Sequence, residues 1–245
     1  MLQETIVTPA DILLPPYPPE SEDWARWAVI ACDQFTSEPE YWEDVEKTVD
    51  GHLSTLDLIL PEVYLGTAVE QEHNRIIAKN MQSICEKLRL FPDSMVYLER
   101  TLPDGRVRRG MIGKIDLEAY DYTPASHSAI RPTEATVVER IPPRVAVRRG
   151  AAVELPHVML LMDDPKDLVI APLADKKPQM ERLYRFPLML GGGYAAGYLV
   201  TGDVQEQLLE ALRAYETRRQ IEALQMDEAE KARRVDTLRH QIAEL

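Results

Sequence analysis

Short apolar runs bounded by prolines, glycines and acids predict several strands in the first 200 residues. The strongest pair is 95–100 and 107–117, because Pro103, Asp104 and Gly105 between them have the chemistry of a tight turn. These two runs therefore predict a β-hairpin. Further strands are predicted over 27–32, 56–60, 158–162, 168–170 and 194–200, the last one following the glycines at 191–193.

Segments whose apolar residues have helical spacing lie between these strands in no regular order. A helix is predicted after Ser37, which has capping-box spacing to Glu40, with Pro39 in the first turn. Its apolar face is Tyr41, Trp42 and Val45. Two more helices are predicted over 71–90 and 176–184. Because no regular βαβ rhythm appears, we expect an α+β fold: a mixed sheet with a β-hairpin and flanking helices, plus a long C-terminal helix.

The segment 203–245 contains neither proline nor glycine and is dense in charge. Apolar residues return at spacings of three and four, at positions 208, 212, 215, 221, 224, 235, 238, 242 and 245. This spacing predicts one long helix or two in line, with a narrow apolar seam that packs on a neighbour or pairs with a second copy. We therefore expect a globular domain over 1–200, a coiled-coil-like helix over 201–245, and a homodimer through 203–245 as one arrangement.

Composition excludes several classes of protein. The 28 Lys and Arg against 41 Asp and Glu give a net charge of −13, which disfavours binding to nucleic acid over a broad surface. No apolar run reaches the roughly 20 residues of a membrane helix, and residues 1–14 lack the features of a signal peptide. Two cysteines, Cys32 and Cys85, cannot form a dense disulfide framework. These features predict a soluble, acidic, cytoplasmic protein.

Charge is distributed unevenly. Residues 1–60 hold 13 acids with only Arg26 and Lys47, whereas residues 100–149 hold nine Arg and one Lys against six acids. One interpretation is that the two segments lie side by side as an ion-paired surface. The other is that the basic segment binds an anionic ligand.

Several strings occur together in this chain: ADILL at 10–14, WAVIACDQFTSEPEYWEDVE at 27–46, LPEVY at 60–64, ERT at 99–101 with RRG at 108–110, IRPTE at 130–134, RIPPR at 140–144, LPH at 155–157 and MLGGG at 189–193. In this order they resemble the bacterial and archaeal family known as domain of unknown function 1015, over roughly residues 9–200.

The resemblance implies a possible chemistry. Members of that family are longer and carry an Asp-Gly-His/Asn-His type motif after the glycine triplet. This motif resembles one carried by the fold that ParB-type nucleotide hydrolases, sulfiredoxin and nucleotide-dependent free-serine kinases share. That similarity implies nucleotide binding or phosphoryl transfer. This chain has no such motif after residue 200, and Asp50-Gly51-His52, upstream, has the composition of a loop.

The segment 126–144 is the best candidate for a ligand site. Arginine forks and threonine hydroxyls suit phosphate or carboxylate groups, because both offer directional hydrogen bonds to oxygen. The candidate ligand-binding residues are Arg131, Thr133, Thr136, Arg140 and Arg144. The alternative is that these arginines pair with the acidic first third of the chain.

Carboxylates supply the remaining candidates. Asp33 and Glu134 are candidate catalytic residues that would orient a second substrate, although Asp33 can equally cap a turn. Asp163 and Asp164 follow a predicted strand and are a candidate Mg²⁺ site, although Asp-Asp-Pro is also an ordinary turn.

Three functional hypotheses follow. The first is a protein that binds a nucleotide or phosphometabolite, with Mg²⁺-dependent, small-molecule kinase-like phosphoryl transfer in complete family members. The second is a non-catalytic interaction or scaffold protein that associates through its C-terminal helix. The third is a chain in which part of the catalytic machinery is missing.

Overall fold

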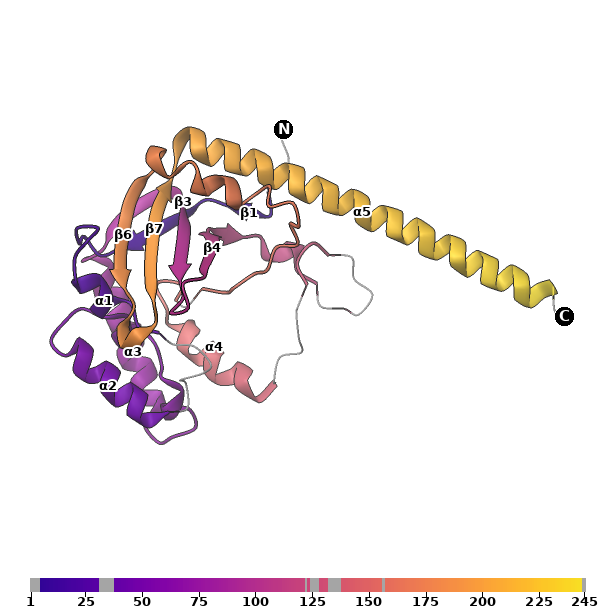
Figure 1. Cartoon of the computed structure of the whole chain (residues 1–245). Coiled ribbons are helices and arrows are strands. Elements are labelled where there is room, and N and C mark those ends of the chain that lie inside the picture. Colours follow the sequence, from indigo (N-terminus) through magenta and orange to yellow (C-terminus); the bar gives the residue numbers. More distant parts are fainter. Residues whose placement is uncertain are drawn as a thin grey trace.

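The computed structural model describes residues 5–30, 38–121, 123, 128–131, 138–155 and 157–243, and the side chains of 140, 223, 224, 226–232 and 234–243 fall outside this description. Its centre is a five-stranded sheet in the order β2 (Ala10–Leu14), β3 (Arg89–Thr101), β7 (Tyr194–Val200), β6 (Glu181–Pro187), with β4 (Val107–Ile112) also paired to β3 (Figure 1). The predicted α+β class is confirmed. Each ladder between these strands is antiparallel, so the expectation of a mixed sheet is corrected.

The predicted hairpin is present. Strands β3 and β4 pair from Val96↔Ile112 to Thr101↔Val107, and the Leu102 N–H donates to the Arg106 carbonyl at 2.8 Å to close the turn. Gly105 has φ +85°, a conformation that glycine adopts without steric cost. Local turn chemistry therefore sets the register of the hairpin.

The two faces of the sheet cover different cores, because successive residues of a strand point to opposite faces. Tyr97 and Met95 face a cluster formed with the first turns of α5 (Gly202–Ala243) and the segment 169–173. Val96, on the other face, packs with Phe91 and Leu183. Next to it lies a larger cluster in which Trp24 of α1 (Asp23–Trp27) stacks on Phe186 of β6.

The helix predicted after Ser37 is α2 (Pro39–Val49), with Pro39 in its first turn and Glu38 at its N-cap. Tyr41, Trp42 and Val45 are buried, as the sequence predicts. The helix predicted over 71–90 is α3 (Glu70–Cys85); it ends earlier because Arg89 already begins β3. A short helix, α4 (Ile141–Arg149), packs against α3.

Four strand predictions are wrong. Trp27 ends helix α1, residues 28–30 are irregular, and the run 56–60 forms the 3₁₀ helix η1 (Thr55–Leu58). The runs 158–162 and 168–170 are irregular, and residues 158–161 are exposed. Apolar composition alone cannot identify a strand, because a strand also needs a neighbour for its backbone groups.

The helix predicted over 176–184 is also wrong. Residues 177–179 form the 3₁₀ helix η6 (Lys177–Gln179), and strand β6 begins at Glu181. The register of β6 against β7 shifts between Arg182 and Tyr184. This irregularity interrupts the two-residue alternation by which a strand is recognised in a sequence.

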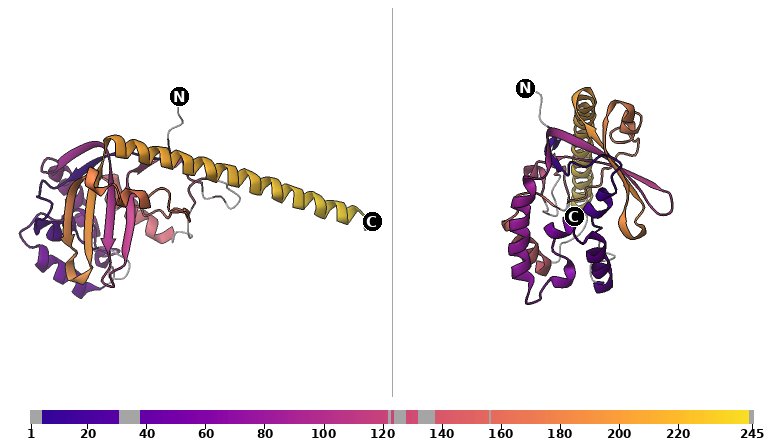
Figure 2. Two further views of the ribbon diagram at one scale, coloured as in Figure 1. Left: turned by 45° about the horizontal axis from the view of Figure 1, so that its top comes forward. Right: turned by 90° about the vertical axis from the view of Figure 1, so that its left-hand side faces the viewer.

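Helix α5 is the long helix that the sequence predicts. Val204, Leu208 and Leu212 in its first turns are buried in the core, and the helix then continues beyond the body (Figure 2). Its 42 residues span about 63 Å at 1.5 Å per residue. Within the described part of the chain, no helix has the length and apolarity needed to cross a membrane.

Candidate functional site

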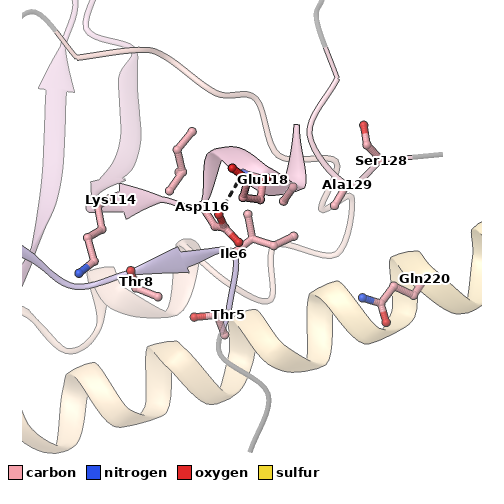
Figure 3. Close-up of a pocket in the computed structure, with 11 residues that line it drawn as sticks. Thr5, Ile6, Thr8, Lys114, Asp116, Glu118, Ser128, Ala129 and Gln220 are labelled. Atoms are coloured by element: carbon pink, nitrogen blue, oxygen red, sulfur yellow. Dashed lines mark hydrogen bonds between the residues drawn. The ribbon is translucent and has the colours of Figure 1, made fainter. Parts of the chain in front are cut away.

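A cleft of about 550 Å³ lies between the N-terminal strand and helix α5 (Figure 3). Its walls are β1 (Val7–Thr8), β5 (Lys114–Ile115), the 3₁₀ helix η3 (Leu117–Ala119), residues 128–129 and one side of α5. The polar lining residues are Thr5, Thr8, Lys114, Asp116, Glu118, Ser128 and Gln220.

Backbone pairing around Ile6 holds the walls together. The Asp116 N–H donates to the Ile6 carbonyl at 2.9 Å, and the Ile6 N–H donates to Oε1 of Glu216 on α5, also at 2.9 Å. Gly113 makes the close approach of β1 and β5 possible, because a Cβ there would lie 2.7 Å from the Thr8 carbonyl oxygen. The cleft therefore depends on contacts between residues more than 200 positions apart in sequence.

Glu216 has an unusual environment for a carboxylate. Partial burial raises its pKa, and the backbone N–H groups of Ile6 and Val7 and the nearby Arg213 oppose this effect. The carboxylate serves as an acceptor for the N-terminal strand rather than as a free acid facing the cleft.

The cleft itself offers one ammonium group, two carboxylates and several hydroxyls. Asp116 caps η3, because its Oδ1 accepts the Glu118 N–H at 3.0 Å. The Ser128 hydroxyl donates to the Ile130 carbonyl at 2.7 Å. Lys114, Asp116 and Glu118 are exposed, so their charged groups are accessible to a ligand.

Of the predicted ligand-binding residues, Arg131 contacts a residue that lines this cleft, although it is not itself a lining residue. Its Nε donates to the carbonyl of Ser128, a lining residue, at 3.4 Å. Arg144 is exposed on the separate helix α4. Arg140 ends η4 (Val138–Arg140), but its side chain is outside the described set, as are Thr133 and Thr136.

The predicted catalytic pair, Asp33 and Glu134, also lies outside the described residues. The predicted metal pair is described, and its two carboxylates have separate partners. Asp163 forms an ion pair with Arg219 of α5 at 2.9 Å, whereas Oδ2 of Asp164 accepts the Val169 N–H at 2.9 Å within the turn.

Among the residues that the structure describes, no three His, Cys, Asp or Glu side chains gather where they could hold a metal ion.

A second polar cluster lies on the sheet and was not predicted. Both oxygens of Glu99 lie 3.0 Å from Nζ of Lys177, and the Tyr97 hydroxyl donates to Oε1 at 2.9 Å. Arg109, opposite Glu99 in the register, lies 3.8 Å away. Burial is the main cause that raises the pKa of Tyr97, and its bond to Glu99 adds to it. The pairing of Glu99 with Arg109 could have been inferred from the hairpin register, whereas Lys177 comes from a distant segment of the sequence.

Arginines of the basic segment 100–149 form ion pairs with acids that are close to them in the sequence. Arg106 pairs with Asp104, Arg109 with Glu99 and Arg148 with Glu154. Within the described ranges, no ion pair joins residues 5–60 to residues 100–149, so an ion-paired surface between the two segments is not observed there.

A family model described as "Protein of unknown function (DUF1015)" matches residues 16–223. The chain belongs to the DUF1015 family. The match extends past the predicted boundary at residue 200 into α5, whose first turns lie in the core, and it includes the cleft residues on β5, η3 and α5. No curated protein and no solved structure matches this DUF1015 chain significantly.

Proposed function

We propose that this DUF1015 chain binds a small phosphorylated metabolite or nucleotide, as its Mg²⁺ complex, in the cleft between β1, β5 and α5. One observation carries the proposal: the arginine- and threonine-rich segment that the sequence singles out contributes residues to the wall of this cleft. Ser128 and Ala129 line the cleft, and the Nε of Arg131 donates to the Ser128 carbonyl.

The cations suit phosphate oxygens. Lys114 lines the cleft as a point charge, and Arg131, bonded to the Ser128 carbonyl, carries a planar fork. The Thr8 hydroxyl adds a neutral partner, whereas the hydroxyls of Thr5 and Ser128 already donate to the carbonyls of Val7 and Ile130. A ligand of metabolite size fits the cleft, because small-molecule sites have volumes of about 300–1,000 Å³.

The two carboxylates that line the cleft are the reason for proposing a Mg²⁺ complex as the ligand. Asp116 and Glu118 would repel a bare phosphate, but they provide the hard oxygen ligands that Mg²⁺ prefers. Mg²⁺ commonly binds through one or two carboxylates together with the phosphates of a substrate. The metal role that the sequence suggested for Asp163 and Asp164 passes in this proposal to Asp116 and Glu118.

Phosphoryl transfer is the further step of the proposal. Catalysis of that reaction consists mainly of positioning and charge neutralisation, which a Mg²⁺–phosphate site with Lys114 and Arg131 would begin to supply. Asp33 and Glu134 remain the candidates for orienting a second substrate, with Thr133, Thr136, Arg140 and Arg144 as further ligand contacts.

Thermal unfolding of the chain with inorganic phosphate, pyrophosphate, ADP and ATP, each with and without Mg²⁺, tests the proposal. A ligand present at 100 times its Kd stabilises the native state by about 2.7 kcal/mol, which raises Tm by several degrees. We expect a rise with at least one of these ligands that requires Mg²⁺. A Tm that none of them changes would contradict the proposal.

A second candidate function is that of an interaction protein. The observation that favours it is the continuation of α5 beyond the body, with Ile221 half-exposed where the buried contacts of the helix have ended (Figures 1 and 2). This candidate does not exclude ligand binding, because α5 contributes Gln220 to the cleft lining, whereas the apolar positions of its distal part begin at Ile221.

A further inference from the structure

We propose that the distal part of α5, residues 217–242, pairs antiparallel with the same segment of a second copy of this chain. The register places Glu228 opposite the partner's Lys231, and Lys231 opposite the partner's Glu228. This inference is independent of ligand binding in the cleft.

The proposal begins from the spacing of positions along the helix. Positions 221, 224, 228, 231, 235, 238 and 242 alternate steps of three and four, which places them on one seam of an α-helix. Five of the seven are Ile, Leu or Val, and the third and fourth are Glu228 and Lys231. The segment covers between three and four heptads, the length at which such a repeat indicates a coiled coil.

The seam positions occupy a different face of the helix from the residues that pack on the core. At about 100° per residue, these positions are on average nearly half a turn around the helix from Leu208, Leu212 and Tyr215, which pack on the core. Ile221, the first seam residue, is 49% exposed, whereas Arg219 still pairs with Asp163 of the body. A second helix can therefore approach the seam without displacing the core contacts.

Charge decides the orientation of the pair. In a parallel, in-register pair Glu228 would face Glu228 and Lys231 would face Lys231, and like charges in a helix–helix seam are destabilising. In the antiparallel pair centred between residues 229 and 230, each Glu228 meets a Lys231. Ile221 then meets the partner's Leu238, and Leu224 meets the partner's Val235.

At the centre of this register, the charges at the positions flanking the seam are complementary. Asp227 comes beside the partner's Arg234, and the twofold symmetry repeats the pair. Farther out, Arg218 comes beside the partner's Arg239, a like-charge contact. The register therefore predicts that Arg239→Glu strengthens the association.

Light scattering on the full chain across a range of concentrations tests the pairing. At roughly 100 µM we expect a molar mass twice that of the 27.9 kDa chain, falling toward that of one chain on dilution. A wild-type chain that stays monomeric throughout this range would overturn the proposal.

Charge variants test the register. Glu228→Lys should weaken the dimer at least about tenfold, and the double variant Glu228→Lys/Lys231→Glu should restore it. Glu230→Lys makes the same charge change on the side of the helix away from the seam and should leave the dissociation constant unchanged. Equal effects of Glu228→Lys and Glu230→Lys would overturn the register.

Disulfide cross-linking tests the orientation, in a background with Cys32 and Cys85 replaced by serine. A mixture of Leu224→Cys and Val235→Cys chains should form a mixed disulfide, and Leu224→Cys alone should not cross-link. Cross-linking of Leu224→Cys with itself would show a parallel pair and overturn the antiparallel assignment.

Discussion

The Ile6 N–H donates a hydrogen bond to Oε1 of Glu216 at 2.9 Å, joining the first strand to the last helix. The Ile6 carbonyl accepts the Asp116 N–H at the same distance. Ile6 therefore ties two walls of the cleft to each other. The shape of the candidate site depends on this residue, although its own side chain is only an aliphatic part of the lining.

Glu216→Gln should stabilise the chain near neutral pH. The folded state raises the pKa of Glu216, so the native state binds the proton more tightly than the unfolded state does, and the wild type loses stability as pH rises through the carboxyl range. The loss is complete above the folded-state pKa. Glutamine has no charge to bury, and its amide oxygen can still accept the Ile6 N–H.

Chemical denaturation of wild type and Glu216→Gln at several pH values checks this expectation. The difference should be present at about pH 7 and should vanish at about pH 3, below both pKa values. If Glu216→Gln is instead less stable than wild type at neutral pH, and this difference disappears at acidic pH, then the charged carboxylate is a net stabilising partner of the strand.

Glu99→Gln should destabilise the chain by about 1–2 kcal/mol. The Glu99 side chain is 15% exposed and binds Lys177, Arg109 and the Tyr97 hydroxyl, so the substitution leaves the buried Tyr97 hydroxyl and two partly exposed cations with no anion. Thermal unfolding is the measurement. Glu210→Gln, an exposed site on α5, is the control, and an equal Tm for the two variants would rule out a structural role for the cluster.

Gly197→Ala should be strongly destabilising, whereas Gly110→Ala should be nearly neutral. Both glycines lie in strands of the central sheet. A Cβ at Gly197 would lie 2.2 Å from the ring of Tyr184, but a Cβ at Gly110 meets nothing within 4 Å. Overpacking of this kind costs about 1–3 kcal/mol, because the ring must leave its place. Similar Tm values for the two variants would contradict this packing.

The sequence predicts those elements whose signals are local. The β3–β4 hairpin follows from turn residues at Pro103–Gly105, and the buried face of α2 follows from helical spacing. Strand β7 follows from the glycines at 191–193 that precede it, and α5 follows from the absence of proline and glycine over 203–245 together with its apolar spacing. In each case a short stretch of chain determines the structure through its own steric and hydrogen-bonding preferences.

The remaining errors concern interactions that a local pattern does not contain. Residues 158–162 have the composition of a strand but pair with none, and Trp27 is buried through helix α1. The cleft combines residues near positions 6, 116, 128 and 220, so no single window of sequence reveals it. The sequence singles out the segment around Arg131 as a candidate, because clustered arginines and threonines are a local signal.

Calorimetric titration of the full chain with pyrophosphate in the presence of Mg²⁺ tests the central claim most directly. We expect saturable binding that Lys114→Ala weakens at least about tenfold, because the only ammonium group among the described lining residues is lost. Lys166→Ala, which removes an exposed lysine from the turn at 164–167, should bind as wild type does. No saturable binding by wild type, or equal affinities for the two lysine variants, would contradict a phosphate site in this cleft.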